Sequence, residues 1–215
     1  MEKKIKRATR ADGERSRQTI LHAAARLATV DGLDGLSIGS LAAHIGMSKS
    51  GLYAHFGSKE ELQLATVDTA AELFAADVVT PTADVEDPLD RIEALTERFI
   101  DYLARRVFPG GCFFAAAAAE FDTHPGPVKE RILEVHDGWL KLMEGLFAQA
   151  QAQGHVSPAE DPSQLAFEID AQLLMANMIF VLHGDENALE RARRAIQTRI
   201  ALAATPKSAA ARTPA

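Results

Sequence analysis

The segment Ser48–Leu62 has the sequence SKSGLYAHFGSKEEL and raises the first question about this chain. Its first turn holds two serines, a lysine and a glycine, and aromatic residues follow before the break at Gly57. Leu52 and Phe56 have the spacing of the buried side of a short helix, and Ser48 suits its N-cap position. A helix that only filled a core would not begin with small polar residues and a cation. We therefore expect this first turn to face a partner outside the fold.

A second short helix is predicted directly before this segment. Ser37 suits its N-cap, Gly46 suits the left-handed position that ends a helix, and apolar residues recur at helical spacing between them. A further helix is predicted from Ser16 to the turn at residues 31–35. Two short helices joined by a tight turn that contains glycine form a helix-turn-helix, which here covers Ser37–Phe56.

The rest of the chain also shows helical spacing, which makes the predicted fold all-α with about nine helices. A fourth helix should run from the capping box at Ser58 to about Val78 and be followed by a loop at residues 80–86. The later helices are predicted to begin at Asp87-Pro88, at Cys112, after Pro125-Gly126-Pro127, at Asp161-Pro162 and at Asn187, which would cap the last one. We divide the chain into a helix-turn-helix domain with a basic N-terminal arm at residues 1–58, a larger helical domain at 59–205 and a disordered tail at 206–215.

Charge is distributed unevenly along the 215 residues. The net charge is −7, but residues 1–60 contain 10 Lys and Arg against 6 Asp and Glu. An anionic partner is therefore expected at the N-terminal end only. The basic run at residues 3–7 is either a phosphate or minor-groove arm or an inert solubilising tail.

Several features favour a cytoplasmic protein without a membrane segment. Cys112 is the single cysteine, which excludes an intramolecular disulfide and suits a reducing compartment. The basic N-terminus lacks the apolar region of a secretory signal. The most apolar run, Leu165–Leu182, contains Glu168 and Asp170, so we predict a buried helix there and not a membrane span.

The helix-turn-helix pattern explains the unusual first turn of the third helix. In such motifs the second helix of the pair enters the major groove, with its N-terminal residues at the base edges. Small residues at Ser48, Ser50 and Gly51 allow a close approach, while Lys49 and the hydroxyls supply donors for bases or phosphates. The N-terminus of the helix capped by Ser37 is a phosphate site in the same geometry.

These residues closely resemble the DNA-binding domain of TetR-family transcriptional regulators, through Leu36-Ser37-Ile38, Leu41-Ala42, His44-Ile45-Gly46 and the segment Ser48–Leu62. The resemblance extends over about residues 15–62. It implies a homodimeric regulator, usually a repressor, that a small molecule releases from a palindromic operator. It also assigns effector binding and dimerisation to residues 59–205, with the dimer interface on the last two helices.

Matching position by position, the resemblance implies DNA contacts by Ser37, Ser48, Lys49, Ser50, Gly51, Tyr53, His55 and Lys59. Gly39 stands where some members of the family carry a basic side chain that reads bases. The third helix should therefore carry more of the base readout in this chain.

The helix predicted after Pro125-Gly126-Pro127 carries two adjacent apolar stripes, one through Trp139 and one through His136 and Met143, so it has more than one partner. In the resemblance, the second space that it faces is an effector pocket, and the fourth helix is the lever to the DNA-binding domain. A mostly apolar lining suits an amphipathic or aromatic effector better than a highly charged one. The candidate lining residues are Phe113, Phe121, His136, Trp139, Leu140, Met143, Phe147, Met175 and Met178.

The sequence also allows two functions other than DNA binding. An all-helical enzyme would use Cys112 or the cluster of Glu120, Asp122 and His124, although acidic residues beside a Pro-Gly-Pro turn also cap helices. The sequence contains no phosphate-binding loop, dinucleotide fingerprint or nucleophile elbow, and no paired histidines with metal-ligand spacing. A purely structural helical dimer does not explain the basic N-terminus. We therefore expect a regulator without enzymatic activity, cofactor or metal.

Overall fold

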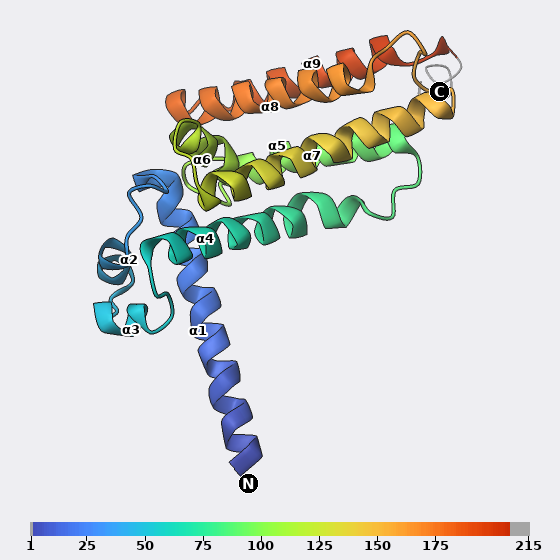
Figure 1. Cartoon of the computed structure of the whole chain (residues 1–215). Helices are drawn as coiled ribbons and strands as arrows, with labels where there is room; N and C mark the ends of the chain where they lie inside the picture. The colour runs from blue at the N-terminus through green and yellow to red at the C-terminus, as the bar shows by residue number, and fades with distance from the viewer. Residues whose placement is uncertain (1, 207–215) are drawn as a thin grey trace. The chain divides into compact units, whose positions relative to one another are not determined.

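The computed structural model describes residues 2–206, with side chains from residue 13 onward. Apart from an isolated bridge between Val156 and Ala204, every regular element in this range is helical. The α-helices (Figure 1) are α1 (Glu2–Asp31), α2 (Ile38–Ile45), α3 (Lys49–Tyr53), α4 (Lys59–Phe74), α5 (Pro88–Ala104), α6 (Phe113–Phe121), α7 (Pro127–Ala152), α8 (Pro162–His183) and α9 (Asn187–Ala203). These nine helices in the described range confirm the predicted all-α fold.

Local capping explains where most of the helices begin. Asp87 accepts the N–H groups of Leu89 and Asp90 at the start of α5, and Asp161 accepts the N–H of Ser163 at the start of α8. Each cap is followed by a proline in the first turn, where the missing N–H has no intrahelical acceptor in any case. Both starts agree with the prediction.

Three boundaries differ from the prediction. The backbone of α1 is helical from Glu2 and not only from the region of Ser16. After α4 the chain continues as a π-helical turn (Ala75–Val79) and a 3-10 turn (Thr80–Thr82), where a loop was expected from residue 80 onward. Pro81 lies in the first turn of that 3-10 segment, where a helix tolerates proline.

At the last helix, Asn187 is the first helical residue and not the cap. The side chain of Asp185 accepts the N–H of Asn187 at 3.0 Å instead. Two further predictions lie outside the part of the chain that is described here: the side chains of the basic arm at residues 3–7, and the tail beyond residue 206.

The first compact unit combines the chain up to Leu73 with Phe108–Leu133. Its core contains Leu33 and Leu36 of the turn before α2, and Leu52 and Phe56 of the α3 region, all of them buried. Helix α1 packs against both α2 and α6. The helix-turn-helix therefore shares one compact body with α6 and the first part of α7, although these segments are far apart in the sequence.

The second compact unit comprises Phe74–Val107 and the chain from Glu134 onward. Helices α8 and α9 run antiparallel, side by side (Figure 1), and form the most extensive helix pair of the described chain. Arg199 of α9 pairs with Glu160 and with Glu168 of α8, and Arg193 of α9 pairs with Glu97 of α5 at 2.8 Å. These ion pairs tie α9 to its neighbours at several points.

Within residues 2–206, α8 is the one helix long and apolar enough to cross a membrane, judged by length and composition alone. A buried helix of a soluble protein meets the same criterion. Asp170 and Asn177 on α8 are buried polar residues, and Glu168 is ion-paired with Arg199. The prediction of a buried helix holds for one side of α8 only, since Phe167 and Leu182 on the same helix are 63% and 70% exposed.

Candidate nucleic-acid interface

Helix α2 is defined at both ends by its own sequence. Ser37 accepts the N–H of Ser40 through its hydroxyl, and the Ser40 hydroxyl accepts the N–H of Ser37, both at 3.0 Å. Gly46 adopts a left-handed conformation with φ of 70° and closes the last turn through its N–H to the Ala42 carbonyl. A residue with a side chain is disfavoured in that conformation. The helix is thus confined to eight residues, and the turn to α3 follows directly.

Helix α3 presents its first turn to solvent, as predicted. The Ser48 hydroxyl accepts the N–H of Gly51 at 3.1 Å and so caps the helix. Lys49 and Ser50 in the same turn are exposed. Leu52 is 0% exposed and packs inward, whereas Tyr53 is 58% exposed. The polar residues and Tyr53 therefore form an outward surface on a helix that is held in place by its buried side.

The C-terminal end of α3 is held by a residue that sequence reasoning did not assign there. The guanidinium of Arg17 lies 4.4 Å from the centre of the Phe56 ring and donates to the His55 carbonyl at 2.8 Å. A cation near the carbonyl groups that end a helix is favourable. His55, a predicted DNA contact, is half-buried. Arg17 thus fixes the position of the helix end that carries His55.

Lys49 lies across the start of α2. Its Cε and Nζ atoms are 3.4 Å and 3.6 Å from the place where a side chain on Gly39 would begin. A larger residue at Gly39 would crowd the Lys49 side chain. Some members of the family carry a basic side chain at the position of Gly39. In this chain Lys49 of α3 occupies the space that such a side chain of α2 would need.

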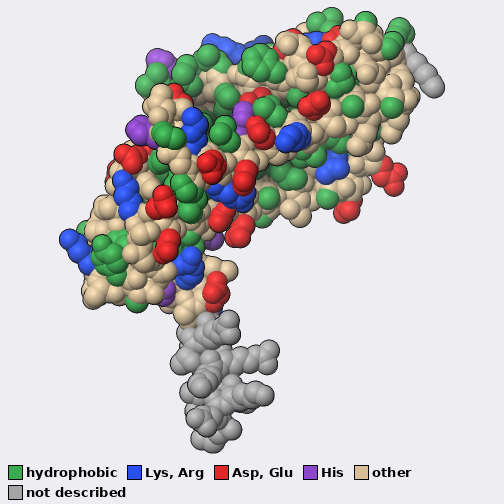
Figure 2. Space-filling view, in the orientation of Figure 1, with side chains coloured by type: hydrophobic (Ala, Val, Ile, Leu, Met, Phe, Trp, Pro, Cys, Tyr) green, Lys and Arg blue, Asp and Glu red, His purple; other side chains and the backbone are tan. Residues whose placement is uncertain are grey.

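Lys59, the last of the predicted contacts, opens α4 and pairs with Asp34 at 3.0 Å. Figure 2 shows basic and acidic side chains interspersed over the visible face, without one continuous basic patch. Lys49 and Lys59 stay predicted DNA contacts, and both are exposed.

The second unit contains a buried polar cluster surrounded by aromatic rings. Trp139 of α7 donates its indole N–H to Oδ1 of Asp170 at 3.0 Å, and Nε2 of His136 lies 3.3 Å from Oδ2 of the same carboxylate. The hydrogen bond to Asp170 raises the pKa of His136 above its ordinary value, and partial burial opposes the rise. The ring centres of Trp139 and Phe99 each lie 5.5 Å from the ring centre of Phe74. The two hydrogen bonds to Asp170 thus join α7 to α8 in an apolar setting.

Two family models match the chain. Residues 20–66 match the model described as bacterial regulatory proteins of the tetR family, and residues 88–196 match a tetracyclin repressor-like C-terminal domain. The chain belongs to the TetR family. It is a DNA-binding transcriptional regulator of a non-enzymatic family, as the resemblance over about residues 15–62 implied.

Solved structures and a curated relative agree with this membership. A TetR regulator of Chloroflexus aurantiacus is 31% identical with a TM-score of 0.83, covering 90% of this chain and 98% of its own. AibR in complex with isovaleryl coenzyme A and operator DNA is 25% identical with a TM-score of 0.67, over 84% of this chain and 95% of its own. The transcriptional regulator AcuR of Cereibacter sphaeroides is 24% identical over 156 residues, which are 72% of this chain and 71% of AcuR.

The residues of the rejected enzyme alternative have structural roles in this TetR-family chain. Cys112 is buried and occupies the N-cap position of α6. The Glu120 carboxylate accepts the N–H of Asp34, and Nδ1 of His124 lies 2.7 Å from the Glu120 carbonyl oxygen. The carbonyl of Asp122 accepts from Lys129. These contacts hold the α6 region and its following turn together.

The residues predicted to line an effector pocket are distributed over the three helices α6, α7 and α8. Phe113 and Phe121 of α6 are buried in the first unit. Five residues of α7 belong to the second unit, where Trp139, Met143 and Phe147 are buried and His136 and Leu140 are half-buried. Met175 and Met178 of α8 are about half exposed, at 52% and 50%. Sequence reasoning did not single out Asp170 for the pocket, although a carboxylate in an apolar run was visible in the sequence.

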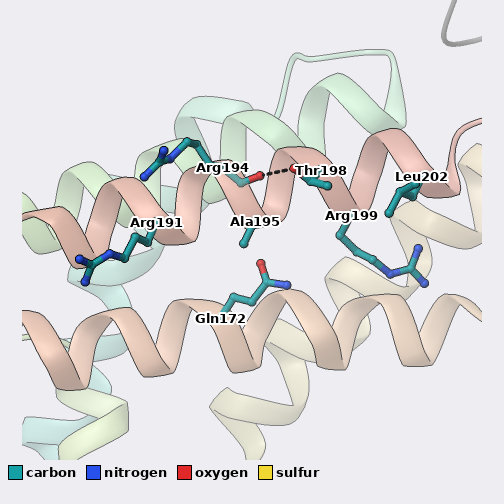
Figure 3. Close-up of a pocket in the computed structure, with 7 residues that line it drawn as sticks. All are labelled: Gln172, Arg191, Arg194, Ala195, Thr198, Arg199 and Leu202. Atoms are coloured by element: carbon teal, nitrogen blue, oxygen red, sulfur yellow. Dashed lines mark hydrogen bonds between the residues drawn. The ribbon is translucent and has the colours of Figure 1, made fainter.

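Two shallow grooves lie between α8 and α9. The larger, of about 510 Å³ (Figure 3), is lined by Gln172, Arg191, Arg194, Ala195, Thr198, Arg199 and Leu202. Its basic side chains come from α9, and Gln172 points toward that helix from α8 (Figure 3). The second, of about 370 Å³, includes Met175 and Ala192 in its lining. This face of α8 and α9 thus combines hollows with exposed apolar side chains.

Proposed function

We propose that this regulator is a repressor that binds a palindromic operator as a homodimer and is released by a small, largely apolar molecule. The observation that carries the DNA-binding part is the exposed first turn of α3, which offers Lys49 and Ser50 on a helix anchored by buried Leu52. In a helix-turn-helix this turn meets the base edges of the major groove. The protein would act in the cytoplasm, where it has access to chromosomal DNA.

The homodimer is proposed to form through α8 and α9. Large apolar side chains are exposed along these two helices, namely Phe167, Met175, Met178, Val181, Leu182 and Leu202. An apolar surface of this kind in a soluble protein marks an interaction site, and a two-fold axis would bury the same residues from both copies. Two recognition helices related by that axis would match the two halves of a palindromic operator.

The effector is proposed to bind in the second unit, near α7 and α8. The surroundings of Asp170 are aromatic, and the carboxylate already accepts from Trp139. Such a setting suits a molecule that is mostly apolar and carries a single polar group able to donate to Asp170. AibR was crystallised with isovaleryl coenzyme A and operator DNA. A neutral alcohol with the same small branched chain, 3-methyl-1-butanol, has one hydroxyl donor and is a suitable first probe, and isovaleryl coenzyme A serves as a highly charged comparison.

Release from DNA requires that the effector prefer a conformation in which the two recognition helices no longer fit the operator. Helix α4 is the proposed lever, because it follows the helix-turn-helix directly. Coupling free energies between two sites are typically about 1–3 kcal/mol, so the effector should weaken operator binding roughly 5–150-fold. Operator DNA should then weaken effector binding by the same factor.

The test begins with an operator selected by the protein from a random duplex pool. Candidate effectors, beginning with 3-methyl-1-butanol and with isovaleryl coenzyme A as the charged comparison, are then titrated with and without that duplex. Unequal affinities, by the same factor in both directions, support an effector-released repressor. Equal affinities for a compound that binds would contradict allosteric release, and failure to select any duplex would contradict operator binding itself.

A further inference from the structure

The turn between α1 and α2 is held by a side chain that lies outside the helix-turn-helix sequence. Oε2 of Glu120, near the end of α6, accepts the backbone N–H of Asp34 at 2.8 Å. Both carboxylate oxygens of Glu120 also lie 3.1 Å from the place where a side chain on Gly32 would begin. Gly32 has a positive φ of 87°, a conformation that favours glycine. The turn therefore has both the shape and the room to receive this carboxylate.

The same turn is held from its other side by α4. The side-chain amide of Gln63 donates to the Leu33 carbonyl at 2.8 Å, and this contact is buried. Glu120 and Gln63 thus engage a donor and an acceptor of two consecutive residues, Asp34 and Leu33. With the backbone bond from Leu36 to Leu33, these contacts fix the turn that leads into Ser37, the cap of α2.

Two further contacts fix α6 and the start of α7 to the same compact unit. The N–H of Gly110 donates to Thr29 Oγ1 at 3.2 Å, and a side chain on Gly110 would begin only 1.8 Å from the Thr29 carbonyl oxygen. The backbones of α1 and the segment before α6 are therefore in direct contact. Arg131 of α7 pairs with Asp68 of α4 at 2.7 Å. These contacts hold α6 and the start of α7 in place, and they therefore also hold Glu120 near the turn.

We propose that Glu120 is a positioning residue for operator binding. Its carboxylate satisfies the Asp34 N–H with a charge-assisted hydrogen bond, which is stronger than a neutral one. The turn so fixed sets the direction in which α2 leaves α1, and α2 supports the exposed turn of α3. Operator affinity thus depends on an acceptor in the C-terminal part of the chain, 86 residues from the amide that it binds.

This inference concerns operator binding by this chain, and it does not depend on the proposed effector. It differs from a purely stabilising role for Glu120 in one measurable respect. A stabilising contact changes the melting temperature and leaves the operator affinity of the folded protein unchanged. A positioning contact changes the operator affinity of protein that is fully folded at the assay temperature.

The test compares three substitutions at Glu120 with a matched control at Glu144, which is an exposed acidic residue of α7. Glu120→Ala removes the acceptor, Glu120→Gln keeps an acceptor at the same reach, and Glu120→Asp keeps the charge on a shorter side chain. The probe is a duplex that the wild-type protein selects from a random pool, measured by gel shift at fixed salt. Melting curves establish that each variant is folded at the assay temperature.

Glu120→Ala and Glu120→Asp should weaken operator binding about tenfold, the size expected from loss of one hydrogen bond to a charged group. Glu120→Gln should stay within about threefold of the wild type, and Glu144→Ala should match it. Amide hydrogen exchange at residues 32–37 should accelerate in the alanine variant. Where the alanine variant does not fold, the comparison of Glu120→Gln with Glu120→Asp decides in its place. Unchanged operator affinity in folded Glu120→Ala, or rescue by aspartate and not by glutamine, would overturn the proposal.

Discussion

Nζ of Lys59 lies 3.0 Å from Oδ1 of Asp34, and this ion pair joins the start of α4 to the turn between α1 and α2. Both side chains are largely exposed, so the pair contributes little to stability. Lys59 is also a predicted DNA contact, and in that role a DNA phosphate would compete with the Asp34 carboxylate for the same ammonium group.

Lys59→Ala should weaken binding to operator and to unrelated duplexes by a similar factor, because a phosphate contact carries no sequence information. Loss of one phosphate contact should also reduce the slope of log affinity against log salt by about 1. Asp34→Asn should act in the opposite direction, since it removes the competing carboxylate and keeps the N–H that Glu120 accepts. Affinities measured at four or five salt concentrations check both variants. An unchanged slope in Lys59→Ala would exclude this residue as a phosphate contact.

Lys49→Ala and Tyr53→Phe should weaken operator binding and leave the fold intact, because both side chains are on the outward side of α3. A good base contact is worth about 1–3 kcal/mol, and a base contact by Lys49 should be lost selectively on the operator. Lys141→Ala, an exposed lysine of α7, is the control for loss of a positive charge. If gel shifts at fixed salt gave wild-type affinity for both variants, the recognition surface would have been assigned wrongly.

Leu182→Glu and Leu202→Glu should shift the protein from dimer to monomer. The two side chains are 70% and 73% exposed on α8 and α9, so the substitutions leave the core of one chain undisturbed and place charges in the proposed interface. Val30→Glu changes another exposed apolar residue, on α1, and should leave the dimer intact. Sedimentation at micromolar concentration measures the outcome. A monomeric wild-type protein would contradict the proposed interface directly.

The pair of His136 and Asp170 predicts a dependence of stability on pH. The hydrogen bond to Asp170 raises the folded-state pKa of His136 above its ordinary value of about 6.5. Protonation therefore stabilises the folded state fully below the ordinary pKa, and this contribution is lost as pH rises through the higher folded value. The His136 side chain is 38% exposed, so solvent screening should keep the effect small.

Thermal melting between pH 5 and pH 8, compared with His136→Gln, measures this contribution. The difference between wild type and variant should be largest at acidic pH and shrink as pH rises above about 6.5. A difference that is constant across the range would show that His136 acts through packing alone. Asp170→Asn is a second variant that removes the charge while it keeps an oxygen for the Trp139 N–H.

The local features of the fold were accessible from the sequence. Ser37, Ser48, Asp87 and Asp161 each cap a helix through a bond to a residue two or three positions away. Such bonds depend on residues within one turn, so their pattern is visible in the order of amino acids. Helical spacing placed Leu52 inside and Tyr53 outside, because residues three or four positions apart lie on the same face of a helix. The sequence prediction failed at residues 80–82, which form a 3-10 turn where a loop was expected.

By itself the sequence therefore determined the all-α class, the helix-turn-helix and its outward turn, because these follow from periodicity and from caps that act over a few residues. Only the tertiary structure decided which distant side chains meet. Arg17 holds the end of α3 across 38 residues, Trp139 meets Asp170 across 31, and Glu120 holds the Asp34 amide across 86. The chain has 30 acidic residues, and no local preference distinguishes the one that reaches a given donor. That choice is made by packing of whole helices, which brings one carboxylate to the donor and leaves the others elsewhere.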